Sequence, residues 1–218
     1  MTRNRFPVPE KRRSLILPAD LAGRHLRVAF FDADNTLREA RSGKPSPHGR
    51  ADLLIRAKCC ERLLQLASEG YLLAIVSNQA GIKLGHISMS EVEEAMQATV
   101  QAFAARGIIF NYYDFAELYN EDRKPEPGMA WRLERQLQLA GYTIDWPGSF
   151  MVGDAGWKRG KEQCPDGRPG SDHSNSDRLF AENIALKYPG FRFFHPVDFF
   201  RSACSPEVAE PEITGESR

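Results

Sequence analysis

The sequence lacks the features of a membrane protein, a secreted disulfide-rich domain or a repeat protein. No uninterrupted apolar run in the 218 residues approaches the roughly 18 that a membrane span needs. The first 13 residues lack the apolar stretch of a secretory signal. The four cysteines form no CxxC pair, which favours reduced thiols in a cytosol. These absences, and the lack of internal repeats, predict a soluble, cytoplasmic protein.

An excess of charge of one sign is also missing. The 29 Lys plus Arg residues balance 29 Asp plus Glu residues, so net charge gives no argument for a nucleic-acid partner. Charge is uneven at the ends, since residues 1–13 are mostly basic and residues 205–218 are mostly acidic. We predict that both ends are flexible extensions of one domain over residues 14–204.

The chain does contain short apolar runs that alternate with stretches of helical period, which is typical of a parallel sheet covered by helices. Ser90 with Glu93 predicts a capping box, and Ser176 a second helix cap. One long loop is expected over 155–175. Strands are predicted over 28–31, 71–76, 110–118, 150–152 and 191–194, and helices over 52–69, 91–105, 129–140, 177–187 and 196–201.

Polar residues collect where the predicted strands end. In open parallel sheets the ligand lies beyond the carboxyl ends of the strands. Four clusters lie at or near such ends, at residues 32–36, 77–79, 123–125 and 153–154. Each cluster alone is ordinary turn chemistry, because Asp, Asn and Ser favour turns. Their order along the chain points to one shared site.

The acids in these clusters suggest phosphoryl chemistry. Asp32 and Asp34 project to the same side of an extended backbone. Gathering Asp32, Asp34 and Asp154 costs electrostatic energy unless a divalent cation lies among them, and oxygen ligands favour Mg²⁺. An ionised carboxylate can then attack phosphorus to give an aspartyl-phosphate, while a second acid moves protons. Ser77 and Lys124 are suited to hold the phosphoryl oxygens.

Four segments resemble, in order, the four motifs of the haloacid-dehalogenase-like hydrolases: FFDADNTL, VSNQAGI, RKPEPGM and MVGD. The resemblance covers roughly residues 28–200. It implies an α/β fold, a three-layer Rossmann-like parallel sheet of order 5-4-1-2-3 with helices on both faces and a small or no cap. Asn35 replaces the glycine common after the DxD pair, but Asn tolerates left-handed backbone geometry.

The same resemblance implies roles for individual residues. Asp32 is the implied nucleophile, Asp34 is the general acid/base, and Thr36 is a supporting residue of the site. The implied metal ligands are Asp32, Asp154 and Asp34, the last through its backbone carbonyl. The implied phosphate-binding residues are Ser77, Asn78 and Lys124.

Longer segments are similar to the 3'-phosphatase domain of the polynucleotide kinase 3'-phosphatases, which remove a 3'-terminal phosphate from DNA ends. They are RKPEPGMAW, DHSNSDRLFAENIAL and HPVDFF. The similarity implies that Asp177 supports the metal site and that Arg178 either anchors a helix start or faces the substrate. Residues 156–162 are too short for a P-loop and end in Glu. We therefore expect no ATP use and no kinase activity, which leaves room for coupling to a separate kinase or ligase.

The loop expected over 155–175 is basic and follows the phosphate site, so it would bind a DNA backbone through sequence-independent contacts. The alternative is a loop that is merely solvated. Trp157 either stacks on a base or packs beneath the loop. Basic residues after the first motif are expected to add phosphate contacts in the same way. The candidate DNA-binding residues of the loop and the helix after it are Lys158, Arg159, Lys161, Arg168 and Arg178, and those after the first motif are Arg38, Arg41 and Lys44.

Two other functions remain open. Histidinol-phosphate and heptose-bisphosphate phosphatases share the four motifs and act on small metabolites. A Cys/His zinc cluster usually precedes their RKP segment, and residues 111–129 contain neither Cys nor His. The other alternative is a catalytically silent module that binds DNA ends, against which the intact acids at positions 32, 34 and 154 argue.

Overall fold

A computed structural model of the chain describes residues 12–19, 21 and 23–201. The expected acidic tail over 205–218 and all but the last two residues of the expected basic segment therefore lie outside the described residues. No helix in the described part of the chain is both long and apolar enough to cross a bilayer. The three cysteines that the structure describes are free thiols.

The core of the fold is a five-stranded sheet in which every neighbouring pair of strands is parallel. Its order is β6-β5-β2-β8-β9, which is the predicted order 5-4-1-2-3 counted from the other edge. The strands are β2 (Val28–Phe31), β5 (Leu72–Asn78), β6 (Tyr112–Ala116), β8 (Phe150–Val152) and β9 (Arg192–Phe194).

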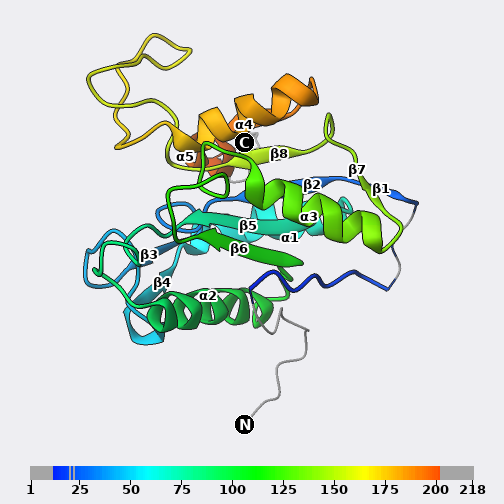
Figure 1. Ribbon diagram of the computed structural model, residues 1–218, viewed down its shortest axis with the longest axis horizontal. Helices are drawn as coiled ribbons and strands as arrows, with labels where there is room; N and C mark the ends of the chain where they lie inside the picture. The colour runs from blue at the N-terminus through cyan, green and yellow to red at the C-terminus, as the bar shows by residue number, and fades with distance from the viewer. Residues whose placement is uncertain (1–11, 20, 22, 202–218) are drawn as a thin grey trace, which may run out of the picture.

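Helices cover both faces of this sheet (Figure 1). Ala29 and Phe31 point to one apolar core, whereas Val28 and Phe30 point to the other, because successive residues of a strand face opposite sides. The first core packs against α1 (Cys60–Ser68), α2 (Met89–Ala104) and α5 (Pro196–Arg201), and the second against α3 (Gly128–Leu139) and α4 (Ser176–Lys187).

The predicted helix over 52–69 is wrong in its first half. That half forms η1 (Arg50–Asp52), β4 (Leu53–Ile55) and η2 (Ala57–Cys59), and only then does α1 begin. The apolar run of β4 pairs antiparallel with β3 (Arg38–Ala40), so tertiary pairing overrides the helical spacing of its leucines. In Figure 1 this β3–β4 unit and the loop over 155–175 extend from the same side of the sheet.

Both predicted helix caps are displaced. The sequence contains two overlapping Ser-x-x-Glu patterns, and the structure uses the earlier one. The backbone N–H of Glu91 donates to Ser88 Oγ (3.2 Å) and that of Ser88 donates to Glu91 Oε2 (2.8 Å). Ser176 is the first residue of α4 rather than its cap, and Asn175 before it makes no side-chain capping bond.

Two features of the amino-terminal region were not expected. The pair β1 (His25–Leu26) and β7 (Thr143–Ile144) is too short to leave a sequence pattern. Arg12 and Arg13 are not free extensions, because their Nε atoms lie 2.9 and 3.1 Å from Oδ1 of the buried Asp114. A buried carboxylate needs such partners, so this ion pairing fixes the end of the described chain against β6.

Candidate active site

Three carboxylates and one lysine meet at the carboxyl edge of the sheet. Oxygen atoms of Asp32, Asp154 and Asp177 all lie within 4.8 Å of one another. The ammonium of Lys124 lies 2.6 Å from Oδ1 of Asp32 and 2.6 Å from Oδ1 of Asp177. Asp32, Lys124 and Asp177 are buried, and Asp154 is half-buried. Residues 145 positions apart in the sequence thus form one compact charged group.

Adjacent strands and a helix start bring these acids together. Asp32 directly follows β2, and its backbone N–H donates to the carbonyl of Val152 at the end of β8 (2.9 Å). Asp177 lies in the first turn of α4, where its Oδ2 accepts from the N–H of Ala155 (3.0 Å). A Cβ at position 153 would collide with the Asp177 carboxylate, so glycine is required beside Asp154.

The electrostatics of this group favour an added cation. Burial raises the pKa of Asp32 well above its usual range, and Lys124 opposes this only in part. Burial, followed by repulsion from Asp177, also raises the pKa of Asp154. Burial alone would lower the pKa of Lys124, but Asp177 and Asp32 outweigh it and raise that pKa. Three oxygen-donor acids around a single ammonium therefore fit a divalent cation with oxygen ligands.

The carboxylate of Asp34 lies outside this acidic group. Its Oδ1 accepts from Arg38 Nε (2.8 Å) and its Oδ2 from Gln79 Nε2 (2.6 Å). Arg38 is buried and also donates to Thr99 Oγ1 (3.0 Å). Arg38 therefore orients the Asp34 carboxylate. The prediction that Arg38 contacts a substrate phosphate is wrong, because its side chain is buried. Sequence reasoning missed both supports of Asp34, although Gln79 belongs to one of the polar clusters.

The backbone after Asp34 adopts the geometry expected for it. Asn35 has a φ of 60°, in the left-handed region that Asn tolerates, which confirms that little is lost by the absence of glycine. Thr36 is buried, and its hydroxyl has no hydrogen-bond partner among the described residues. Arg41 and Lys44 are exposed on the connection between β3 and β4.

Ser77 and Asn78 at the end of β5 have different surroundings. Ser77 is buried, and its Oγ accepts from Gln79 Nε2 (3.0 Å), which leaves its own O–H proton for another acceptor. Asn78 donates through Nδ2 to the carbonyl of Lys124 and accepts through Oδ1 from the N–H of Lys124, both at 2.9 Å. Asn78 thus holds the Lys124 backbone in place, so the structure gives it a positioning contact where phosphate binding was expected.

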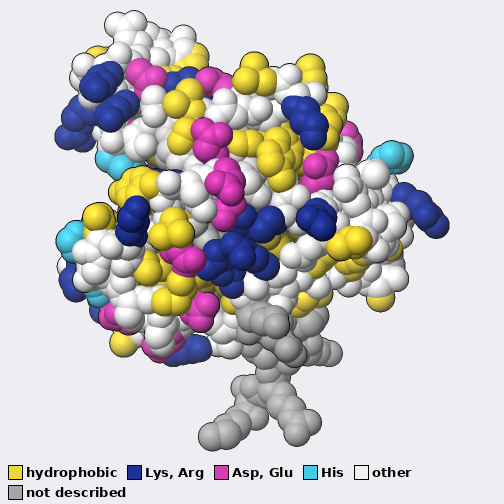
Figure 2. Space-filling view, in the orientation of Figure 1, with side chains coloured by type: hydrophobic (Ala, Val, Ile, Leu, Met, Phe, Trp, Pro, Cys, Tyr) yellow, Lys and Arg dark blue, Asp and Glu magenta, His cyan; other side chains and the backbone are white. Residues whose placement is uncertain are grey.

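The loop over 155–175 presents basic side chains beside the acids. Figure 2 shows Lys and Arg side chains on the projecting part of the molecule where Figure 1 places this loop. Lys161 and Arg159 are exposed, whereas Arg168 pairs with Asp166 (2.6 Å). A pocket of about 230 Å³ at the base of the loop is lined by Lys158, Arg159, Ser171, Asp172 and His173. Among the expected DNA-binding residues of the loop, Arg168 is therefore partly neutralised by an ion pair, whereas Arg159 and Lys161 form no ion pair with a described carboxylate.

Arg178 and Trp157 stabilise the loop from within. The Arg178 guanidinium contacts Glu162 and Glu182 (2.5 Å each) and donates to the Gly156 carbonyl (2.9 Å). It therefore anchors the start of α4, which is one of its two expected roles. The Trp157 ring packs on the Phe193 ring at 5.6 Å, so it lies beneath the loop and is not presented for stacking.

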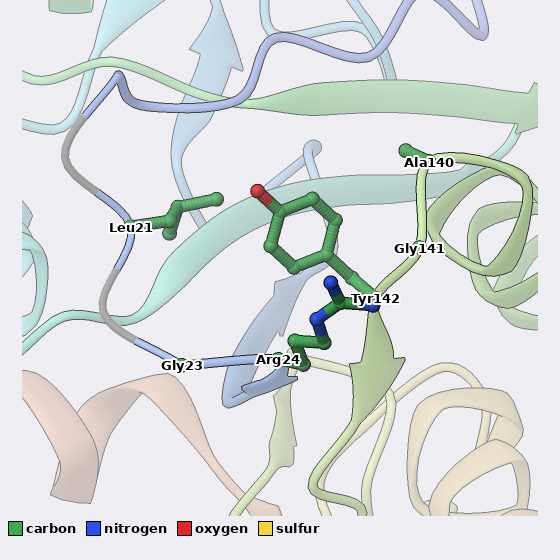
Figure 3. Close-up of a pocket in the computed structure, with 6 residues that line it drawn as sticks. All are labelled: Leu21, Gly23, Arg24, Ala140, Gly141 and Tyr142. Carbon is green, nitrogen blue, oxygen red and sulfur yellow. The ribbon is translucent and has the colours of Figure 1, made fainter.

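A larger pocket, of about 380 Å³, contains none of the predicted site residues. It is lined by Leu21, Gly23, Arg24, Ala140, Gly141 and Tyr142 (Figure 3). Arg24 and Tyr142 lie next to β1 and β7, before the amino end of β2. This pocket therefore lies away from the strand ends that gather the acids.

Comparison with known proteins identifies relatives over most of the chain. The family model described as polynucleotide kinase 3 phosphatase matches residues 27–200. An uncharacterized 20.8 kDa protein of Autographa californica nuclear polyhedrosis virus is 32% identical, over 74% of this chain and 81% of that protein. The polynucleotide 3'-phosphatase ZDP of Arabidopsis thaliana is 29% identical over 83% of this chain, which spans only 25% of ZDP.

The other similar proteins include phosphatases that are named for a small molecule, heptose bisphosphate. The D-glycero-D-manno-heptose-1,7-bisphosphate 7-phosphatase of Chlorobaculum tepidum is 27% identical over 59% of this chain and 69% of that protein. The solved structure of a Mesorhizobium loti protein assigned to the HAD-like phosphatases has a TM-score of 0.62 at 16% identity, over 90% of this chain and 96% of that one. A B. bronchiseptica D,D-heptose 1,7-bisphosphate phosphatase, complexed with magnesium and phosphate, has a TM-score of 0.57 at 14% identity, over 82% and 96% of the two chains. At these identities, the similarity to the two solved structures shows that this chain has the same fold as they do.

Proposed function

This chain belongs to the polynucleotide kinase 3 phosphatase family and is a phosphatase, a phosphoric monoester hydrolase, and from that premise we propose that it removes 3'-terminal phosphate from DNA ends. The observation that supports this most directly is the buried group of Asp32, Lys124 and Asp177 beside Asp154. The exposed basic loop next to Asp154 supports a polyanionic substrate, because its side chains can contact phosphates beyond the scissile one.

The proposed cofactor is Mg²⁺, held by Asp32, Asp154 and the backbone carbonyl of Asp34, with Asp177 in support. When bound, the ion neutralises phosphoryl oxygens and offsets the repulsion among the carboxylates. Lys124 and the free O–H of Ser77 are placed to bind further phosphoryl oxygens. Asp32, Lys124 and Asp177 are each held by a contact from another part of the chain, so this part of the site is organised before substrate binds.

In the proposed reaction, the Asp32 carboxylate attacks phosphorus and the 3'-oxygen of the DNA leaves. Asp34 donates the proton that the leaving oxygen takes, and later accepts one from the water that hydrolyses the aspartyl-phosphate. Arg38 and Gln79 hold the Asp34 carboxylate for both steps. Asn78 acts indirectly, because it holds the backbone of Lys124 in place.

A metabolite phosphatase of the heptose-bisphosphate or histidinol-phosphate type is the second candidate, favoured by the relatives that are named as heptose-bisphosphate phosphatases. Within the described residues, the acidic group at the sheet edge is the only set of His, Cys, Asp and Glu side chains close enough to bind a metal. The segment before Lys124 provides no Cys or His for a zinc cluster. A silent end-binding module is the third candidate.

The test compares phosphate release from a 3'-phosphorylated oligonucleotide, heptose bisphosphate and histidinol phosphate. We expect the highest kcat/KM with the oligonucleotide, and a KM for it that rises with salt because phosphate contacts are screened. Preference for either metabolite would replace the DNA assignment with the second candidate. Oligonucleotide binding without any phosphate release would support the third.

Mg²⁺ is expected to stabilise the protein more at pH 8 than at pH 5. The pKa values of Asp32 and Asp154 are raised by burial, so the folded protein holds their protons more tightly than the unfolded chain does. The stability that protonation contributes is present at low pH and is lost as pH rises through the raised pKa values. Mg²⁺ replaces those protons, so its effect grows where they are absent.

Thermal unfolding with and without Mg²⁺ measures this difference. The matched variant is Asp154→Asn, which removes one charge of the acidic group. It should unfold at a higher temperature than the unaltered protein at pH 8 without Mg²⁺ and should lose most of the shift that Mg²⁺ produces. An equal Mg²⁺ shift at both pH values would contradict the proposed metal site.

A further inference from the structure

Tyr119 lies exposed at the same edge of the sheet as the acids, flanked by two cations. We infer that it is a stacking residue for a base near the 3' end of the substrate, which makes it a specificity determinant for nucleic acid. This inference rests on the proposed function and assigns the part of the substrate next to the scissile phosphate.

Exposed apolar side chains gather on the two loops that leave β5 and β6. Tyr119 is 58% exposed, Leu118 45% and Leu84 56%. Tyr119 is the only aromatic residue among the large apolar side chains that are exposed in the described part of the chain. The two loops begin side by side, because Asn78 at the end of β5 pairs with Ala116 at the end of β6. An exposed aromatic ring in this setting is a surface on which a base can stack.

Two cations lie around the ring, and neither has an acidic partner among the residues that the structure describes. Arg123 Cζ lies 4.5 Å and Lys83 Nζ 5.5 Å from the centroid of the Tyr119 ring. Neither cation forms an ion pair with a carboxylate that the structure describes, and Arg123 Nη1 is buried without a hydrogen-bond partner there. No described carboxylate neutralises these two charges, so both cations make the surroundings of the ring more positive, and the exposed Lys83 can contact a phosphate.

Two of the four acids of the same loop are paired with arginines. Glu117 pairs with Arg12 (3.4 Å), and Asp122 pairs with Arg132 and lies 3.9 Å from Arg13. Glu121 is exposed, and its backbone carbonyl accepts from the N–H of Gly128. The charges of Glu117 and Asp122 are thereby neutralised, whereas Glu121 and Glu126 are exposed and form no ion pair with a residue that the structure describes. The positive charge next to the ring therefore comes from Lys83 and Arg123.

Tyr119 is also close in sequence to the phosphate site. Only residues 120–123 separate it from Lys124, whose ammonium contacts Asp32 and whose backbone is fixed to Asn78. The Lys83 ammonium lies farther from the ring centroid than the Arg123 guanidinium does, and Lys83 extends from an exposed loop. A base that stacks on the ring would take the place of the Lys83 ammonium, which would then contact the sugar-phosphate backbone.

The test compares Tyr119→Ala, Tyr119→Phe and Leu186→Ala, a control that removes an exposed apolar side chain from α4. The substrates are a 3'-phosphorylated oligonucleotide, the same strand with abasic sites at its last two positions, and glycerol phosphate. We expect Tyr119→Ala to raise the KM for the intact strand about five- to a hundredfold, the factor that base stacking supplies, with little change in kcat. Tyr119→Phe and Leu186→Ala should match the unaltered protein.

Two outcomes overturn the inference. One is an unchanged KM for the intact strand with Tyr119→Ala, and the other is an equal rise for the abasic strand and for glycerol phosphate. Failure of the proposed function looks different, because the unaltered protein would then turn over glycerol phosphate or a metabolite but not the strand. A strand with 2-aminopurine as its last base gives a second readout, since its fluorescence should fall on binding to the unaltered protein and much less with Tyr119→Ala.

Discussion

Replacement of Asp32 by asparagine is expected to lower kcat for a 3'-phosphorylated oligonucleotide by on the order of 10⁴-fold or more, as loss of a covalent nucleophile does in other enzymes. Asparagine has nearly the same shape and keeps one oxygen that can accept from Lys124, but its amide cannot attack phosphorus. The measurement is phosphate release at saturating Mg²⁺ and substrate.

The same variant is expected to remain folded and to unfold at an equal or higher temperature without Mg²⁺. Burial raises the pKa of Asp32, so the ionised carboxylate is costly in the folded state and a neutral side chain removes that cost. Asp52→Asn is a control with the opposite expected effect on stability, because hydrogen bonds from His48 and Ser42 lower the pKa of Asp52. Asp52→Asn should therefore lower the unfolding temperature. A near-normal rate for Asp32→Asn would exclude Asp32 as the nucleophile.

The sheet and its polar edge were accessible from the sequence because their signals are local. Short apolar runs predicted the five strands, and the alternation along β2 and β5 assigns their residues to two cores. Asp32 directly follows β2 and Asp154 closely follows β8, so parallel pairing alone brings them to one edge. The resemblance of residues 172–186 to a known family added Asp177, which the structure places 2.6 Å from Lys124.

The contacts of the longer side chains were not accessible in the same way. Asn78 and Lys124 are 46 residues apart, so nothing local in the sequence indicates that the amide of one holds the backbone of the other. Arg38 follows the first motif like a phosphate-binding residue, yet the packing of α2 buries it against Thr99. The helix predicted over β4 was wrong for a related reason, because residues 53–55 become a strand by pairing with β3, which lies elsewhere in the sequence.

Lys124→Met is expected to lower the free energy of unfolding at pH 8 by about 3–5 kcal/mol, the usual result when one partner of a buried ion pair is removed. The ammonium is 1% exposed and lies 2.6 Å from both Asp32 and Asp177. Methionine fills a similar volume but leaves these two buried carboxylates without their cation. Chemical denaturation without Mg²⁺ measures the loss.

The pH dependence of that loss identifies its cause. At pH 5 the carboxylates left by Lys124→Met can take up protons more readily than at pH 8, so the destabilisation should be smaller there. Adding Asp32→Asn to Lys124→Met should restore part of the stability, because the double variant has one buried charge fewer. Lys158→Met, at a lysine without an ion pair among the described residues, should change stability by less than about 0.5 kcal/mol. If Lys124→Met is as stable as the unaltered protein at pH 8, the ammonium is not what holds the acids together, and the role of Lys124 is confined to binding phosphate.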